Sequence, residues 1–378
     1  MNYSYSFANV KRDLSDVLST VIADAPRFIS LFGRAADAKS TKHEWLEDQI
    51  AGRSFVASAV TGSNITVSAT DAAKVQVGTL FNVKGDSAVF KVSAVNGTAV
   101  TFALVGANGS KKTAPAASDV LEVISSPAKE GSNAGENTFH QSGAEFNYTQ
   151  IIRKDVVLTG TALAIDVYGA DNAINRQTQF ALQEMTRDLN RMAIRGVRVA
   201  GTAAEDRVAG GLYYFGTTAE GLAVPLETAA KLDSYIINDA AQAVLGAGGD
   251  PAMILCSPGQ ARVLSAELKD QIQVLREDTR RGAYVAVVVN DITGRGMTII
   301  ADPDMPDTDA FVCDPAGFGI SFLAGRGIAD FDATEKSFDG IKRTVLGEFT
   351  FEFKNAKQRI CRISNLTPSA AALAALRK

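Results

Sequence analysis

The sequence feature that most constrains the fold is one long amphipathic segment near the middle of the chain. Apolar residues recur there at steps of three or four, from Ile174 through Leu182 and Leu189 to Met192, which is the spacing of one face of an α-helix. A helix of about 25 residues is about 40 Å long. Its methionines and leucines are typical of core packing rather than of a ligand pocket. We therefore expect an extended chain organised along this helix.

The segments before this helix differ sharply in composition. Residues 1–50 indicate a mixed, partly helical arm with an apolar stripe from Val10 to Val21. From Gly52 to about residue 125, short alternating runs such as SFVASAV and AVFKVSAV are separated by turn signals such as KGDS and NGT. This pattern predicts a small all-β module inserted into the chain. The module has no tryptophan with which to stack a sugar, so we expect a structural sandwich or barrel. The polar residues that follow, to about 150, predict a long extended segment.

After the long helix, helix and strand patterns alternate as in a compact α/β lobe. The run LETAAKLDSYIINDAAQAVLGAG predicts a second helix that is ended by glycine. AMILCSP predicts a buried strand, after which Ser257 would cap a third helix with Pro258 in its first position. Near the end of the chain, apolar and polar positions alternate from Leu346 to Phe353, which predicts long antiparallel strands.

The residue types needed for catalysis or metal binding are scarce. There are two histidines, and His43 in HEWLE lacks the second imidazole of the zinc motif H-E-x-x-H. His140 lies between turn-forming residues, where a surface or interface histidine is expected. No G-x-S-x-G motif is present. We therefore expect no enzyme, no metal and no cofactor, and an unusual carboxylate pair stays open as an enzymatic alternative.

Two loops have the composition of ligand-binding sites, but they lack the order of elements or the further residues that such sites need. GAGGDP at 246–251 follows a predicted helix and precedes a strand, the reverse of the order in phosphate-binding loops, so it predicts a helix end. Asp302, Asp304, Asp307 and Asp309 in ADPDMPDTD could bind calcium. Two prolines stiffen that loop, however, and the glycine and distal glutamate of an EF-hand are missing. We expect a solvated turn there.

The charges of the chain nearly balance. There are 38 Lys and Arg against 42 Asp and Glu, a formal net charge of -4, so no global basic field exists to hold nucleic acid. No segment has the apolar length of a signal peptide or of a membrane span, which favours a protein of the cytosol or of something assembled there. Three cysteines, Cys256, Cys313 and Cys361, lie far apart in apolar surroundings, which predicts buried free thiols.

Several phrases follow one another in a familiar order along the chain. They are STKHEWLEDQIAG, the EG of KEGSN, FNYTQIIRKDVVLTGTALAIDVYG, EMTRDLNRMAIRG, VVVNDITGRGMTIIADPDMPDTDAFVCDP and GEFTFEFKNAKQRICRI. Together they resemble the major capsid proteins of tailed phages with the HK97-like fold, specifically the group similar to the phage SU10 capsid protein. NDITGRGM is richer in glycine than that pattern, and residues 197–225 match no part of it.

The resemblance implies an α+β, HK97-like fold with an inserted all-β module at about 52–125. The long helix would be the spine of the peripheral P-domain, and the A-domain would pack around capsomer centres. The implied parts are the N-terminal arm at 1–50, the E-loop region with the module at 51–155, the P-domain with the spine helix at 156–225, the A-domain at 226–335, and returning P-domain strands with the C-terminus at 336–378.

The resemblance also implies a structural function. The chain would be a major capsid protein that self-assembles into pentamers and hexamers of an icosahedral-type shell around double-stranded DNA, in the virion, after assembly in the bacterial host cytoplasm. Implied partners are further copies, a portal, non-specifically packaged DNA and, as an option, a decoration protein, with no membrane. Because the arm begins almost at Met1, we expect a separate scaffolding protein. A phage carbohydrate- or receptor-binding structural protein stays the alternative, since it would also explain the β module.

Loop and helix charges supply the candidate contact residues. The candidate inter-subunit contacts are Lys129, Glu130, Arg153, Lys154, Glu184, Arg187, Asp188 and Arg191, and the candidate inward basic groups are Lys11, Arg12, Arg27 and Arg34. On the long helix we expect the arginines, including Arg195, mainly to pair with Glu184 and Asp188 at i,i+3 spacing. The lysine to asparagine cross-links of HK97 would need Lys129 or Lys154 with Asn355. We expect none, because loop lysines are normally solvated.

Overall fold

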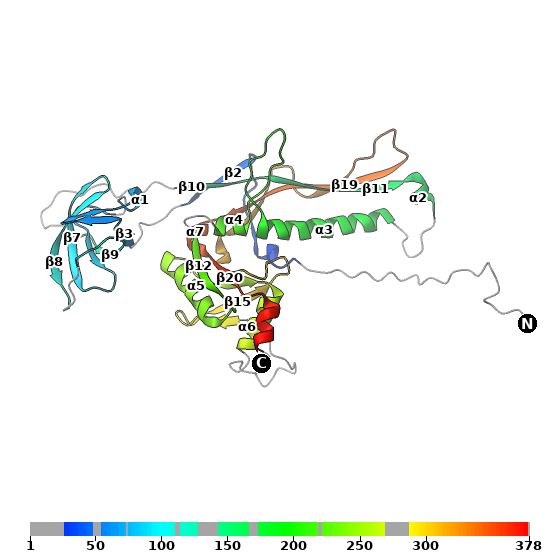
Figure 1. Ribbon diagram of the computed structural model, residues 1–378. Helices are drawn as coiled ribbons and strands as arrows, with labels where there is room; N and C mark the ends of the chain where they lie inside the picture. Colours follow the sequence, from blue (N-terminus) through cyan, green and yellow to red (C-terminus); the bar gives the residue numbers. More distant parts are fainter. Residues whose placement is uncertain are drawn as a thin grey trace, which may run out of the picture. The chain divides into compact units, whose positions relative to one another are not determined.

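The computed structural model describes residues 26–47, 54–72, 75–109, 114–127, 143–165, 173–217, 221–268 and 287–376. Contacts divide the chain into two compact units. One is Leu46–Ala144, called the barrel unit here. The other combines Met1–Trp45 with Glu145–Lys378 and is called the main unit. Figure 1 labels the helices and strands of both.

The barrel unit is built from one antiparallel sheet of seven strands. Two of them are neighbours in sequence and form the two ends of the sheet: β3 pairs with β9, and β4 pairs with β5. Because only two residues separate β3 from β4, a single segment brings the two ends of the sheet together, as in a small barrel. The elements are β3 (Ser54–Val56), β4 (Ala59–Thr61), β5 (Asn64–Thr66), α1 (Ala69–Ala72), β6 (Leu80–Val83), β7 (Ala88–Asn96), β8 (Ala99–Ala107) and β9 (Val120–Ser125).

The barrel unit has an aromatic core of its own. Phe81 lies at its centre, with ring centroids 5.5 Å from Phe55, 5.6 Å from Phe90 and 6.0 Å from Phe102. All four rings are buried, together with Ile65 and other aliphatic residues. The strand pattern read from the sequence over this region is confirmed. That the region is an insertion relative to related proteins stays a prediction.

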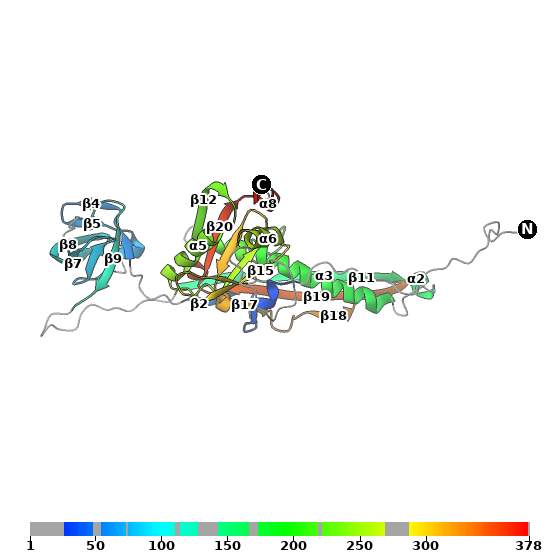
Figure 2. The same cartoon turned by 90° about the horizontal axis from the view of Figure 1, so that it is seen from below.

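The long helix predicted from the sequence is confirmed as α3 (Ala173–Arg195) in the main unit. It runs alongside β11 (Gln150–Thr159) and β19 (Gly340–Phe353), which pair antiparallel over ten residues (Figures 1 and 2). Strands β17 (Phe318–Phe322), β18 (Ala329–Asp332) and β1 (Gly33–Arg34) extend this sheet. The short helix η2 (Ile29–Leu31) precedes β1 in the sequence, and the short helix α2 (Gly160–Ala164) follows β11.

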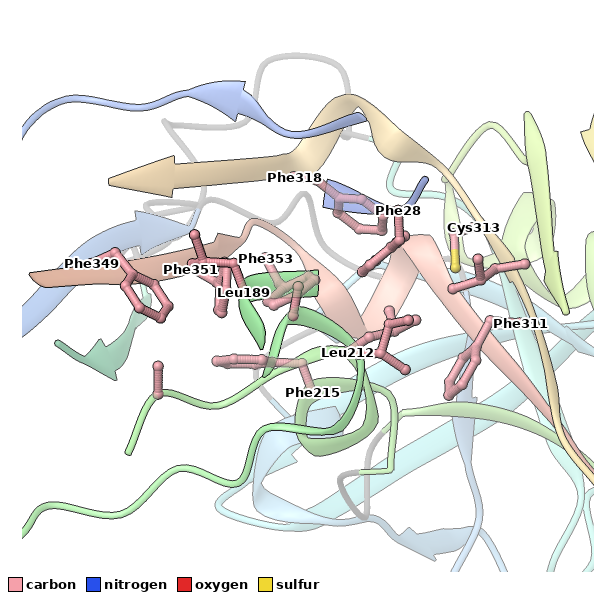
Figure 3. Close-up of a cluster of buried hydrophobic side chains, with 14 of the residues drawn as sticks. Phe28, Leu189, Leu212, Phe215, Phe311, Cys313, Phe318, Phe349, Phe351 and Phe353 are labelled. Atoms are coloured by element: carbon pink, nitrogen blue, oxygen red, sulfur yellow. The ribbon is translucent and has the colours of Figure 1, made fainter. Parts of the chain in front are cut away.

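The core between α3 and the sheet is rich in phenylalanine. Leu189 of the helix packs in one cluster with Phe349, Phe351 and Phe353 of β19 (Figure 3). Met185 belongs to the same cluster. Each such side chain contributes about 1.5–3 kcal/mol when it is fully buried. The intervening residues of β19 are also buried: Glu348, Thr350 and Glu352 are at most 3% exposed. This strand is therefore enclosed on both faces from Gly347 to Phe353.

A second sheet of six strands forms the other part of the main unit. Its order is β12-β20-β16-β13-β15-β14. The helices α5 and α6 end and begin as predicted: Gly248 takes a φ of 97° after α5, and Ser257 accepts the cap hydrogen bond of α6. The elements are α4 (Leu212–Gly216), β12 (Leu222–Ala230), α5 (Ser234–Ala247), β13 (Met253–Cys256), α6 (Pro258–Glu267), β14 (Val287–Val289), β15 (Gly296–Ala301), β16 (Ala310–Cys313), η3 (Pro315–Gly317), α7 (Ala356–Arg359), β20 (Ile360–Leu366) and α8 (Ser369–Leu376).

The pairing of the final strands corrects one expectation. Residues 336–378 were expected to return to the sheet of the long helix, and β19 does so. Strand β20, however, pairs with β12 and β16 in the six-stranded sheet, where buried apolar residues such as Ile360 and Ile363 suit a central strand. Strands β17 and β18, although they lie within 226–335, pair with β19.

The three cysteines are free and buried, as predicted. Burial raises the pKa of Cys256 and of Cys361 to about 12, so both thiols are protonated at neutral pH. Within the described ranges, none of the helices combines the length and the apolar character that crossing a membrane requires.

We predict that residues 54–125 can be replaced by a short Gly/Ser linker without unfolding the main unit, because the barrel unit has its own sheet and its own core. The main unfolding transition should shift by no more than about 2–4 °C in thermal denaturation. Insoluble protein with every linker length tried would show that this segment is integral to the main core.

Candidate functional site

The charged residues singled out in the sequence gather along α3. Lys154 of β11 lies with its Nζ 2.7 Å from Asp188 Oδ2 and 3.7 Å from Glu184 Oε2. The hydrogen bond with Asp188 raises the pKa of Lys154, although partial burial opposes it. The stabilisation from this group is therefore complete at neutral pH and is lost as pH rises through the raised pKa.

One turn further along α3, two arginines reach the loop that follows β15. Arg191 Nε donates to Asp304 Oδ1 at 2.6 Å, and Arg195 Nε donates to the Asp304 carbonyl oxygen at 2.8 Å. We expected these arginines mainly to pair along the helix. The structure joins the helix charges to β11 on one side and to this loop on the other, so they fasten α3 to its own chain.

This loop, residues 302–309, is called the acidic loop here, and the expectation of a solvated turn was wrong. Asp302 is fully buried and Asp304 is 8% exposed. Asn190 of α3 donates through Nδ2 to Asp302 Oδ2 at 3.0 Å and to Asp304 Oδ2 at 2.9 Å. The backbone N–H groups of Phe28 and Asp304 complete the donors to Asp302. The carboxylates are buried because donors from three segments converge on them.

The second half of the acidic loop contacts further elements. Asp307 accepts from Ser257 Oγ at 2.6 Å and from the Ser369 N–H at 2.5 Å. Burial would raise the pKa of Asp307, but these hydrogen bonds hold it below its ordinary value. Asp309 accepts from Tyr213 at 2.7 Å and from Arg362 at 3.1 Å. Among the residues that the structure describes, no group of three or more potential ligands forms a metal site.

The other candidate residues have simpler surroundings. Arg153 is 60% exposed and pairs with Asp155 at 3.0 Å. The half-buried Arg187 has an Nε without a hydrogen-bond partner in the described part of the chain. Arg27 donates to the Ala301 carbonyl oxygen, and Arg34 pairs with Asp37 at the surface. Four candidates lie outside the described residues, and so does the histidine predicted to be at the surface or at an interface: Lys11, Arg12, Lys129, Glu130 and His140.

Two buried carboxylates that sequence reasoning missed lie on β19. Glu348 accepts from Thr149 Oγ1 at 2.7 Å and from Arg207 Nη2 at 2.6 Å, and it pairs with Arg326 Nε at 3.0 Å. The alternation in GEFTFEF places Glu348 and Glu352 on one face of the strand and the phenylalanines on the other. That signal indicated a polar face, but not that distant segments would bury it.

His43 belongs to this polar face and not to a zinc helix. It lies on β2 (Lys42–Glu47), which pairs with β10 (Gly143–Tyr148), and its Nε2 is 2.6 Å from Glu352 Oε1. Burial would raise the pKa of Glu352, but hydrogen bonds from His43 and Lys354 lower it. The stabilisation from this carboxylate is therefore present at neutral pH and is lost as pH falls through the lowered pKa.

These described carboxylates have partners that position them, and the partners are cations, amides and hydroxyls of the same chain. None is arranged with a nucleophile and a base as in an acyl-transfer site. The arrangement fixes the relative positions of α3, β11, β19 and the acidic loop, which is the chemistry of a scaffold.

Replacing Asn190 tests this scaffold directly. We predict that Asn190→Ala lowers the free energy of unfolding by about 2–4 kcal/mol, because two buried carboxylates lose their shared donor. Gln183→Ala, at an exposed position of the same helix, should change it by less than about 0.5 kcal/mol. Urea denaturation followed by circular dichroism measures both, and equal losses would contradict the role of Asn190.

Comparisons with known proteins agree with the family resemblance. The sequence profile described as SU10 major capsid protein matches residues 1–367. No curated protein matches the chain. Similar solved structures include the capsid of an empty GTA particle, with a TM-score of 0.54 and 10% identity, covering 95% of this chain and 96% of that chain. The capsid of Myoviridae phage XM1 has a TM-score of 0.53 and 7% identity, covering 94% and 97%.

A structure from Microbacterium phage Oxtober96 is similar as well, with a TM-score of 0.51 and 11% identity, covering 94% of this chain and 96% of that chain. At such identities these structures show the fold, which is HK97-like, while the match of the profile to most of the chain shows the family. The chain therefore belongs to the SU10 major capsid protein family, as a structural subunit of a phage capsid.

Proposed function

We propose that copies of this chain form pentamers and hexamers that join into an icosahedral-type shell around double-stranded DNA. The observation that carries the proposal is the family match over residues 1–367. In this shell, residues 1–50 and 51–155 act as the arm and the E-loop region that reach neighbouring subunits. Residues 156–225 supply the spine of the P-domain, and 226–335 the A-domain at the capsomer centre. Closed symmetry requires one surface to serve several such contacts.

The proposed function includes no enzymatic activity. Its support is chemical: the described carboxylates around α3 and β19 are paired with cations and amides that hold them in place. A general acid or base would instead need access to a substrate and a pKa near the working pH.

The exposed charges of the spine are proposed to meet neighbouring subunits. Arg153 is 60% exposed, and Glu184 and Arg191 are each 55% exposed, so each can accept a second partner. Lys154 and Asp188, each about one third exposed, serve the chain's own packing first. Lys129, Glu130 and Arg187 complete the proposed contact set. Exposed ion pairs contribute roughly 0–1 kcal/mol each, so assembly depends on many of them.

Further partners are proposed on the family membership alone. They are a portal, a separate scaffolding protein and an optional decoration protein, with assembly in the cytoplasm of the bacterial host. The shell is proposed to form without covalent links between subunits, since nothing in the sequence identifies a carboxylate that would assist a lysine to asparagine bond.

Expression of the chain alone, followed by electron microscopy, tests the proposal. We expect roughly isometric closed particles, of uniform size only when a scaffolding protein is supplied. Denaturing electrophoresis of the particles should give one band near 39.9 kDa. Discrete small oligomers would contradict the shell, ladders of linked chains would contradict non-covalent joints, and uniform shells of native size from this chain alone would remove the need for a scaffold.

DNA binding gives a second test. A chain with a formal net charge of -4 is not expected to attract DNA overall, and local contacts would come from Lys11, Arg12, Arg27 and Arg34. We predict weak binding without sequence preference that disappears at moderate salt, because it depends on counterion release. Titration of the soluble subunit with two unrelated duplexes at rising salt measures this. Tight binding of one duplex that survives moderate salt would overturn the capsid function in favour of sequence recognition.

A further inference from the structure

We propose that residues 197–211, called the clasp here, hold the ribbon β2/β10 in one position on the main unit, with Arg198 and Arg207 as positioning residues. The clasp lies between the end of α3 and the start of α4, in a stretch that matches no part of the family pattern read from the sequence. The proposed shell contacts give it no function, and the scaffold described above uses only its Arg207, through Glu348.

Hydrogen bonds within the clasp hold its backbone in one conformation. Val199 and Val208 exchange both backbone hydrogen bonds, at 3.0 and 3.1 Å, and the Thr202 N–H donates to the Glu205 carbonyl oxygen at 3.0 Å. Gly201 has a φ of +72°, and a Cβ there would lie 2.9 Å from Arg207 N, so this tight turn requires glycine. The two arginines therefore extend from a fixed backbone.

Arg198 holds the outer end of β10. Its Nη1 donates to Glu145 Oε1 at 2.6 Å and to the Phe146 carbonyl oxygen at 2.7 Å. The guanidinium carbon lies 3.9 Å from the centroid of the Phe146 ring and 4.7 Å from that of Tyr214. The side chain is 17% exposed, and partial desolvation strengthens both the ionic and the cation–π contacts.

The next residue of β10 is locked by an amide. Asn147 is fully buried, and its Nδ2 donates to the carbonyl oxygens of Gly210 and Phe351, both at 2.9 Å. Its Oδ1 accepts from the Gly210 N–H at 2.8 Å. One side chain thus ties together β10, the clasp and β19, with both of its amide protons used.

The contacts continue past the end of β10. Arg207 Nε donates to the Thr149 carbonyl oxygen at 2.6 Å, while its Nη2 donates to Glu348. The Ala209 N–H donates to Gln150 Oε1 at 3.1 Å. The clasp therefore holds five of the six residues from Glu145 to Gln150.

The partner strand β2 is held to the same face. Lys42 Nζ lies 4.1 Å from the centroid of the Phe146 ring, and His43 contacts Glu352. The main-unit residues of both strands are thereby held by contacts and not by the stiffness of the ribbon alone. A two-stranded ribbon alone is marginally stable in water.

The sharpest test compares two arginines that share one carboxylate. Arg207 and Arg326 both pair with Glu348, but only Arg207 also holds the Thr149 carbonyl oxygen. In hydrogen exchange of the soluble subunit, R207Q and R198Q should speed exchange of the amides of 143–149 by about tenfold or more, because each loses charge-assisted hydrogen bonds to this strand. R326Q should leave these amides within about twofold of the unsubstituted chain. Amides of α3 and β13 serve as the check of folding.

Equal acceleration by R326Q, or none by R198Q and R207Q, would overturn the proposal. If R207Q does not fold, R198Q against R326Q decides it. Electron microscopy adds an assembly measurement, which rests on the proposed reach of residues 51–155 to a neighbour: the clasp variants should give fewer closed particles than R326Q. Closed particles in equal number from all variants would overturn the link between the clasp and assembly while leaving the proposed shell intact. Failure of the unsubstituted chain to form shells would count against the proposed function, and hydrogen exchange would still decide the clasp.

Discussion

Enclosure of β19 on both faces is the constraint on which the rest of the main unit depends. One face presents phenylalanines to α3, and hydrophobic packing needs no particular partner there beyond shape. The other face presents Glu348 and Glu352, which are at most 3% exposed. A buried carboxylate costs several kcal/mol unless cations and hydrogen-bond donors surround it. The chain therefore has to bring donors to this face from segments that are distant in sequence.

The acidic loop, which contacts the last residues of α3, also buries carboxylates that need donors from distant segments. Asp302 accepts hydrogen bonds from Phe28, which is 274 residues away along the chain, and from Asn190, which is 112 residues away. Because each donor comes from a different element, the loop joins the segment before the first strand, the long helix and the six-stranded sheet. Removal of one donor leaves a charge buried without compensation, so these contacts specify one arrangement more sharply than apolar packing does.

The sequence alone predicted those elements whose structure depends on residues close to them along the chain. The three- and four-residue spacing predicted α3, the glycine after Ala247 predicted the end of α5, and Ser257 with Pro258 predicted the start of α6. The sequence did not predict which residues are buried where their burial depends on partners that are distant along the chain. The prolines and aspartates of 302–309 have the composition of a solvated turn, and nothing local shows that Asn190 and Phe28 will cover them. Strand β20 was misplaced for the same reason, since the choice between two sheets is made by tertiary contacts.

These contacts separate the charges that hold the subunit from those that are free to meet another. Asp302, Asp304, Glu348 and Glu352 are buried and hydrogen-bonded, so a neighbouring subunit gains nothing from them, and removal of one of their partners weakens the subunit itself. Arg153 and Glu184 are more than half exposed, so each can exchange water for a new partner at little cost. A shell built from many copies needs this separation, because each subunit has to keep one internal geometry while its surface accommodates several slightly different neighbours. Buried charges keep the internal geometry of the subunit, because each needs its partners in fixed positions. Exposed charges allow the surface to accommodate different neighbours, because water can replace any one partner.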